Sequence, residues 1–176
     1  LGYDITKLGG KGRRQNLKSS EIQKKGDEWS KSGGSVDVMT VWKFITQARY
    51  LKKGVDLTAE KGGGVKGVVN QSEYQQNKTR WEGIESIWTS ALINIIDVNN
   101  VKIYGEGTID GSGTEWPGFG RQNSQQRQQL SQVARDSIMR IPRLGRPRMI
   151  CFQNCHKVHI SDLKLRNQAV WCLHIL

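Results

Sequence analysis

The sequence predicts an all-β solenoid, in which short strands wind into coils that stack on one another. Two observations predict it: a strand pattern recurs at a fixed spacing, and turn residues divide that pattern into short runs. The recurring pattern links five apolar pairs at a constant offset of 57 residues: Ile93 and Ile150, Ile95 and Phe152, Val98 and Cys155, Val101 and Val158, and Ile103 and Ile160. Each unit of a solenoid buries its apolar row only against its neighbours, so this self-similarity is typical of the class.

The composition fits one domain or a piece of a larger one. The 176 residues carry 27 Lys and Arg against 16 Asp and Glu, a formal net charge of +11, and 36% are hydrophobic. No apolar run approaches the ~18 residues that a membrane span requires. These features exclude a collagen, a coiled coil and an integral membrane protein, while the six Trp argue against a wholly disordered chain.

The chain begins with a polar, basic and Gly-rich stretch, residues 1–36, which we expect to be a cap region with at best one short helix between Glu21 and Ser32. Short β-like runs follow over 37–111, separated by Gly clusters such as 62–64, and we expect them to form the early coils.

A third, weaker copy of the repeat lies at 51–57, with Val55 placed 46 residues before Val101. In all copies the alternating apolar residues predict an inward row, and the Asn or Lys turns between strands predict the corners.

A long segment, 112–147, separates the two clear copies. Between Ser124 and Ile141 several apolar residues fit one helical face: Leu130, Val133, Ala134, Ile138 and Ile141. We predict an inserted loop with a short amphipathic helix, of the kind that more often carries function than core packing. Residues 148–176 are then the next coils.

The cysteines and two histidines do not predict a metal site. Cys151, Cys155 and Cys172 lack the spacing of zinc ligands, and we interpret Cys151 and Cys155 as small buried hydrophobic residues. His156 and His159 straddle a strand without a third ligand at recognisable spacing, and we interpret them as surface histidines.

Near the end of the sequence, alternation along a strand from Ala169 to Leu176 predicts opposite orientations for two ring-bearing residues. Trp171 shares one face with the apolar residues at 173 and 175, whereas His174 lies on the other face. We therefore expect the two side chains to point apart, unless a bulge intervenes. Core packing of Trp171 and a structural polar contact of His174 remain alternatives to a binding role.

Positive charge is concentrated between Arg121 and Arg148, where seven Arg face one acid, Asp136. Clustered Arg can bind carboxylates or phosphates through paired hydrogen bonds, so a polyanion is a natural partner. Nucleic acid is the weaker alternative, because no aromatic residues are interleaved with these charges. A solvated basic loop without a partner also stays open.

Four segments form a set of landmarks: 79–85 with the sequence TRWEGIE, 91–111 ending in GEGTIDG, 146–155 beginning with RP, and 167–174 with Trp171 and His174. Together they resemble motifs of the polygalacturonases, glycoside hydrolase family 28, and the first resembles its bacterial exo-acting branch. The likeness is strong over 79–176 and faint over 1–66. The chain thus looks like the N-terminal part of such a protein.

This resemblance implies a right-handed parallel β-helix of the pectin-lyase-like type. It also implies hydrolysis of α-1,4-linked galacturonate in pectin with inversion, needing neither metal nor cofactor. In such a reaction one carboxyl protonates the leaving oxygen and another activates water, with the two roughly 6.5–9.5 Å apart. The implied partner is an acidic polysaccharide, pectin or polygalacturonate, and not a membrane. The implied location is extracellular or periplasmic.

The family's catalytic motifs, Asn-x-Asp, Asp-Asp, Gly-His-Gly and Arg-x-Lys, are expected after the segment that ends at Leu176. The sequence contains no Asp-Asp pair and no Gly-His-Gly. No catalytic residue can be carried over, and we expect the chain alone to be inactive. The candidate substrate-binding residues are Trp171, His174 and Arg146.

Two further interpretations stay open. Glu106 and Asp110 could be an acid and a base, but both lie beside Gly, where Asp commonly stabilises turns, and we favour the structural interpretation. The alternatives to an enzyme are a non-catalytic carbohydrate-binding β-solenoid and a basic nucleic-acid-binding module.

Overall fold

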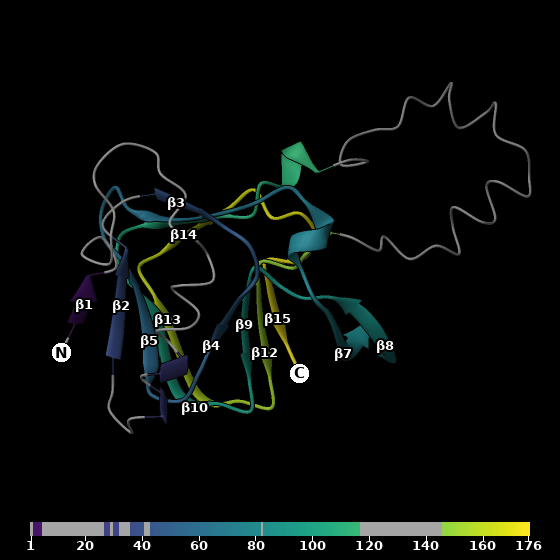
Figure 1. Cartoon of the computed structure of the whole chain (residues 1–176), viewed down its shortest axis with the longest axis horizontal. Coiled ribbons are helices and arrows are strands. Elements are labelled where there is room, and N and C mark those ends of the chain that lie inside the picture. Colours follow the sequence, from purple (N-terminus) through teal and green to yellow (C-terminus); the bar gives the residue numbers. More distant parts are fainter. Residues whose placement is uncertain are drawn as a thin grey trace, which may run out of the picture.

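A computed structural model describes residues 2–4, 27–28, 30–31, 36–40, 43–81, 83–116 and 146–176. In this part of the chain three parallel β-sheets run along one solenoid, and one antiparallel hairpin stands beside them (Figure 1). The predicted all-β parallel solenoid is confirmed. The fold is a parallel β-helix.

The strands fall into three sheets, which we name A, B and C. Sheet A contains β1 (Gly2–Asp4), β2 (Val36–Thr40), β5 (Val55–Ala59), β10 (Asn99–Tyr104) and β13 (His156–Ser161). Sheet B contains β3 (Lys43–Thr46), β6 (Gly64–Gly67), β11 (Thr108–Asp110) and β14 (Lys164–Arg166). Sheet C contains β4 (Arg49–Leu51), β9 (Ile93–Ile96), β12 (Ile150–Gln153) and β15 (Leu173–Ile175). The hairpin consists of β7 (Gln76–Trp81) and β8 (Ile84–Thr89).

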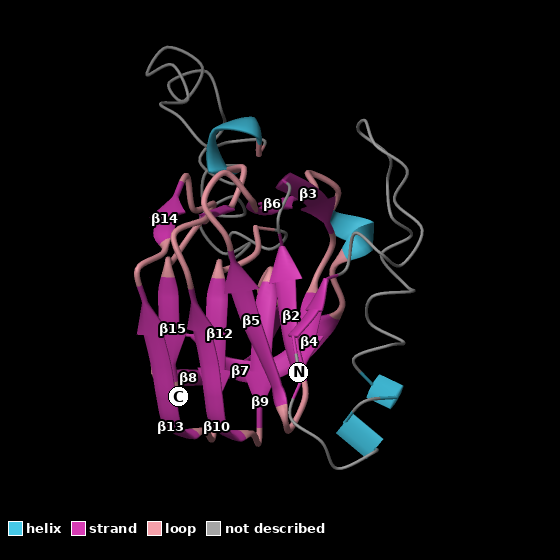
Figure 2. Cartoon of the chain, turned by 90° about the vertical axis from the view of Figure 1, so that its left-hand side faces the viewer, coloured by secondary structure: helices cyan, strands magenta, loops and turns pink. Residues whose placement is uncertain are grey.

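Each coil contributes one strand to each sheet, so the described coils are β2–β3–β4, β5–β6–β9, β10–β11–β12 and β13–β14–β15 (Figure 2). The pairing register confirms the repeat read from the sequence. In sheet C, Ile93 pairs with Ile150 and Ile95 with Phe152, and in sheet A, Ile103 pairs with Ile160. The weaker copy is confirmed too, because Leu57 pairs with Ile103, an offset of 46.

The inward row forms the core, and its burial depends on having a coil on both sides. Ile95 and Ile103, in the middle coils, are fully buried, each with 0% of its surface exposed. Val158 and Ile175, in the fourth described coil, are 36% and 76% exposed, although they pair in register with the buried Val101 and Phe152. The same pattern therefore produces a dry core in one coil and an apolar surface in the next.

The corners between sheet C and sheet A use left-handed backbone conformations. Asp97 and Asn154 stack there with φ of 55° and 50°, and Asn100 and Lys157 stack with φ of 59° and 57°. Asn and Asp tolerate this conformation best among residues with a side chain. Asn154 Nδ2 also donates to Asp97 Oδ1 at 2.6 Å, which joins successive corners. The predicted Asn and Lys corners are confirmed.

Close packing between coils explains why position 107, in the GEGTIDG segment, is a Gly. A Cβ at this position would lie 2.5 Å from the Cβ of Ala59 in the coil before it. The coils approach so closely at this corner that a side chain does not fit, which accounts for a Gly in GEGTIDG by packing.

The connections from sheet B to sheet C differ most in length. They span 47–48, 68–92, 111–149 and 167–172, and they hold the hairpin and two 3₁₀ turns, Gln71–Glu73 and Gly113–Glu115. The amphipathic helix predicted between Ser124 and Ile141, in the inserted loop 112–147, lies outside the described residues.

In the cap region, residues 27–28 and 30–31 are helical, in agreement with the short helix expected between Glu21 and Ser32. The division into 1–36, 37–111, 112–147 and 148–176 stays a prediction. Among the described residues, no helix has the length and apolar character needed to cross a membrane.

Candidate functional site

Three connections from sheet B to sheet C run side by side where they enter sheet C. The amide of Leu92 donates to the carbonyl of Arg148 at 2.8 Å, and the amide of Met149 donates to the carbonyl of Trp171 at 2.9 Å. Residues 92, 148 and 171 are far apart in the sequence, but the stacking of coils makes them neighbours. Side chains from three successive connections can therefore form one cluster at this edge.

Arg148 lies at the centre of this cluster. Its side chain is almost fully buried, with 2% of the residue exposed. Nη1 donates to Thr79 Oγ1 at 3.1 Å and Nη2 donates to the carbonyl of Arg80 at 2.9 Å, both in the hairpin. The guanidinium carbon also lies 5.4 Å from the ring centroid of Trp171, a cation–π distance. Burial lowers the pKa of Arg148 from its ordinary value.

Trp171 and His174 are in contact, and the expectation that they point apart is wrong. Their ring centroids lie 4.9 Å apart with an interplanar angle of 31°. The strand β15 begins at Leu173, and residues 169–172 bend before it, so strand alternation does not extend back to Trp171. The structure thus unites two of the three candidate binding residues.

His174 projects from the outer side of sheet C but is covered, with 9% of its surface exposed. Its Nδ1 lies 3.5 Å from Sγ of Cys151, the residue beside it in the register of β12 and β15. Burial, and secondarily the charge of Arg148, lower the pKa of His174 to about 4. The imidazole is therefore neutral at pH 7 and can donate one hydrogen bond and accept one.

The hairpin β7–β8 packs one face against the outer side of sheet C. Asn77 Nδ2 donates to Tyr50 Oη at 2.8 Å, and Trp88 is 1% exposed. In the same hairpin, which stands beside sheet C (Figure 1), Ile84 and Ile87 are exposed. This hairpin was not predicted from the sequence. Its signal in the sequence is Gly83 between two β-like runs, because Gly adopts the positive φ that hairpin turns require, here 86°.

Arg146, the third candidate binding residue, is half-buried and precedes Arg148 by two residues. Its binding role stays a prediction. Arg148 was counted in the basic stretch but was not singled out, because sequence spacing gives no sign that the hairpin lies beside it.

The cysteines and histidines of the last coils are placed largely as expected. Cys151 is buried and Cys155 and Cys172 are half-buried, and all three are free thiols. Burial raises the pKa of Cys151 and of Cys172, which favours the protonated thiol. His156 and His159 are exposed on β13. Among the described residues no three metal-ligating side chains cluster.

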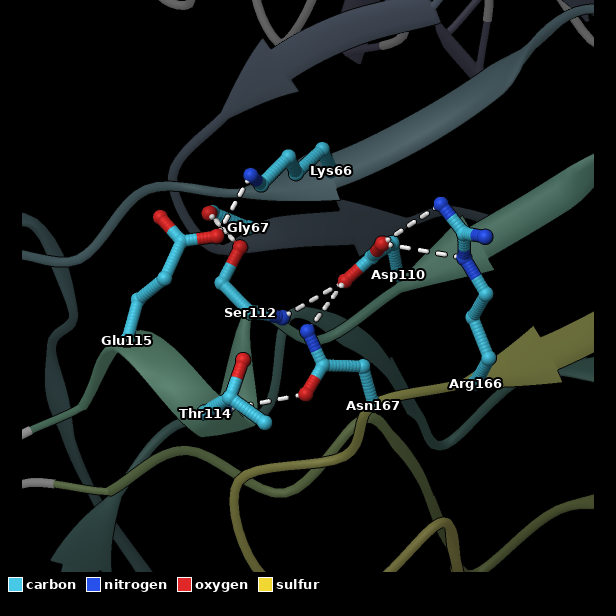
Figure 3. A network of polar contacts seen from close by, with 8 residues as sticks. All are labelled: Lys66, Gly67, Asp110, Ser112, Thr114, Glu115, Arg166 and Asn167. Atoms are coloured by element: carbon cyan, nitrogen blue, oxygen red, sulfur yellow. Dashed lines mark hydrogen bonds and ion pairs between the residues drawn. The ribbon is translucent and has the colours of Figure 1, made fainter. Parts of the chain in front are cut away.

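Asp110 belongs to a second polar cluster, at the end of sheet B (Figure 3). Its carboxylate accepts hydrogen bonds from the Ser112 amide at 2.9 Å and from Asn167 Nδ2 at 3.1 Å. Arg166 pairs with the other oxygen at 3.0 Å. Glu106 is exposed. These contacts agree with the turn-stabilising interpretation of Asp110.

No family model matches this sequence, and no curated protein matches it. Solved structures do. An exopolygalacturonase from Thermotoga maritima aligns with 99% of this chain and 44% of its own, at 26% identity and a TM-score of 0.75. A family 28 exopolygalacturonase from Yersinia enterocolitica aligns with 96% of this chain and 35% of its own, at 17% identity and a TM-score of 0.71.

A polygalacturonase from Erwinia carotovora aligns with 90% of this chain and 41% of its own, at 23% identity and a TM-score of 0.59. The chain thus spans less than half the length of these three proteins. The resemblance to the polygalacturonases of family 28 is confirmed at the level of the fold.

Proposed function

We propose that this chain is part of a pectin-degrading glycoside hydrolase, and that the outer side of sheet C binds galacturonate units of the substrate. The observation that carries the proposal is the contact of Trp171 with His174, 4.9 Å between ring centroids, beside the guanidinium of Arg148. The polygalacturonase fold supports the substrate class.

The chemistry of the ligand fits these residues. A galacturonate ring has an apolar C–H face and a carboxylate. The indole of Trp171 offers a flat apolar surface, and the neutral imidazole of His174 offers a hydrogen bond. Arg146 supplies a cation for the carboxylate, and the net charge of +11 favours the approach of a polyanion.

The proposed reaction is hydrolysis of α-1,4-galacturonosyl linkages with inversion, which requires two carboxyls roughly 6.5–9.5 Å apart. Asp110 is held in a structural network, and the sequence has no Asp-Asp pair. We therefore propose that these 176 residues contribute substrate binding and release no reducing sugar on their own. The proposed location is extracellular or periplasmic.

Binding to oligomers tests the substrate class. Calorimetry at matched ionic strength compares trigalacturonate, neutral galactotriose and single-stranded DNA. We expect trigalacturonate to bind most tightly, because both its ring face and its carboxylates are recognised. Equal binding of galactotriose contradicts the role of the cations, and preference for DNA overturns the carbohydrate proposal.

A non-catalytic carbohydrate-binding solenoid is the second candidate, favoured by the contacts that hold the Asp110 carboxylate in a turn. Both candidates bind the oligomer. They are separated by reducing-sugar release from polygalacturonate by the protein that carries this segment: release supports the hydrolase, and binding without release supports the solenoid.

A further inference from the structure

We propose that Arg148 is a positioning residue of the candidate site: its guanidinium, bound to the hairpin β7–β8, holds the rings of Trp171 and His174 in the arrangement that receives a galacturonate unit. The proposal rests on the proposed function for the identity of the ligand. The geometry that carries it is independent of any ligand.

The burial of Arg148 argues that it acts through other residues. With 2% of its surface exposed, its guanidinium is inaccessible to a polysaccharide that lies on the protein. Burying a cation is costly and is tolerated where hydrogen bonds and nearby π-faces compensate the lost hydration. Because its contacts must compensate the lost hydration, the guanidinium is held in one position between the hairpin and the indole.

The hairpin fixes one side of the guanidinium. Thr79, itself 5% exposed, accepts from Nη1, and the carbonyl of Arg80 accepts from Nη2. Two acceptors on two different nitrogens set the orientation of the planar group. The hairpin is in turn held against sheet C by the hydrogen bond from Asn77 to Tyr50.

The guanidinium also contacts Trp171, 5.4 Å from the ring centroid. Because the amide of Met149 donates to the carbonyl of Trp171, the main chains that carry residues 148 and 171 are also linked. His174 lies on the same indole, and its neighbours in the register are Cys151 and, one strand on, the uncharged Asn94. The charge that faces His174 comes from Arg148, which agrees with its lowered pKa.

These contacts form a chain from the hairpin to the two rings. A displacement of the hairpin changes the orientation of the guanidinium, and the guanidinium sets the position of the indole. The hairpin thus acts on ligand binding without having to contact the ligand.

The test uses the 176-residue chain with Arg148→Met, Arg148→Lys and Thr79→Val, and Lys102→Met as a control that removes an exposed cation on sheet A. The pKa of His174 is measured by NMR without ligand, and trigalacturonate affinity by calorimetry. We expect Arg148→Met to raise the pKa of His174 by about one unit and to weaken trigalacturonate about tenfold.

Arg148→Lys should keep the pKa of His174 low, because the charge remains, yet weaken binding about threefold or more, because a single ammonium cannot reproduce the two-point contact. Thr79→Val, which removes one acceptor and retains the shape, should weaken binding severalfold and change the His174 pKa little. Lys102→Met should resemble the wild type in both measurements.

Wild-type affinity in a folded Arg148→Met variant, or an unchanged His174 titration, overturns the proposal. If Arg148→Met does not fold, an unchanged affinity in Thr79→Val overturns it instead. If the wild type does not bind trigalacturonate, the proposed function fails, whereas unchanged ligand-free NMR shifts of the Trp171 and His174 rings in Arg148→Met overturn the positioning role by themselves.

Discussion

The cluster of Asp110, at the end of sheet B, and the cluster of Arg148, where the connections enter sheet C, are built differently. In the cluster of Asp110, a carboxylate receives an amide, a side-chain amide and a guanidinium, so donors and acceptors satisfy one another. In the cluster of Arg148, a buried cation meets two neutral oxygens and an indole that a neutral imidazole also contacts. The first cluster closes a turn, and the second contains the two rings of the proposed binding site.

The largest expected effect tests the stabilising role of the first cluster. Asp110→Ala removes the acceptor of the fully buried Ser112 amide, of Asn167 and of Arg166. We expect the free energy of unfolding to fall by about 2–4 kcal/mol, measured by urea denaturation, because the buried Ser112 amide loses its acceptor and two further polar contacts are lost. Trigalacturonate affinity of the folded fraction should be unchanged.

The control is Glu106→Ala, which alters an exposed carboxylate in the same motif and should change the stability by about 0.5 kcal/mol or less. Equal effects of the two substitutions would remove the distinction between a network that supports the fold and a solvated charge.

The second effect is a pH dependence of the free energy of unfolding, which we assign to His174 in the second cluster. The pKa of His174 lies near 4 in the folded protein and near 6.5 when unfolded. As the pH falls from about 6.5 to about 4, the unfolded chain gains a proton that the folded chain does not, so unfolding becomes easier by about 1–3 kcal/mol. Above this window the contribution is constant.

Urea midpoints measured between pH 7.5 and 4.5 check this dependence. His174→Gln should flatten it, whereas His159→Gln, at an exposed position, should retain it. A dependence that survives in His174→Gln contradicts the assignment.

The third effect is on binding. Trp171→Ala removes the flat surface of the second cluster, and we expect trigalacturonate affinity to fall about tenfold, or about 1.4 kcal/mol. Tyr104→Ala, at a half-buried aromatic residue of sheet A, is the matched control and should bind as the wild type does. A similar loss in both variants would mean that aromatic residues contribute to the fold and not to the site.

The smallest effect lies at the rim of the first cluster. Lys66 and Glu115 form an ion pair of 2.6 Å, but both side chains are substantially exposed. Glu115→Gln should lower the free energy of unfolding by less than about 0.5 kcal/mol, and by less still at 0.5 M salt, because water and salt screen such pairs. A loss comparable to that of Asp110→Ala would extend the network to the surface.

The periodic part of the fold could be predicted because stacked coils need apolar residues at equivalent positions. The offset of 57 residues between Ile93 and Ile150 predicts that the two residues pair in register, and they do so in the parallel sheet C. The corner residues were predictable for the same reason, since Asn100 and Lys157 adopt a conformation that their position in the repeat requires.

The candidate site could be predicted only in part. Trp171 and His174 were identified, but their contact depends on the bend at 169–172, which strand alternation does not encode. Arg148 and Thr79 are 69 residues apart, and their hydrogen bond exists because two unequal connections enter sheet C at the same edge. Contacts between irregular segments of different length leave no periodic signal in the sequence.

That shared edge has a consequence for redesign. The coils vary there from the two residues at 47–48 to the long spans 68–92 and 111–149, yet the stacked rows keep their register. The connections from sheet B to sheet C can therefore be exchanged without changing how the strands stack. We expect a peptide grafted in place of 167–172 to be held at both ends by strands of the solenoid and to contact the neighbouring connection 111–149.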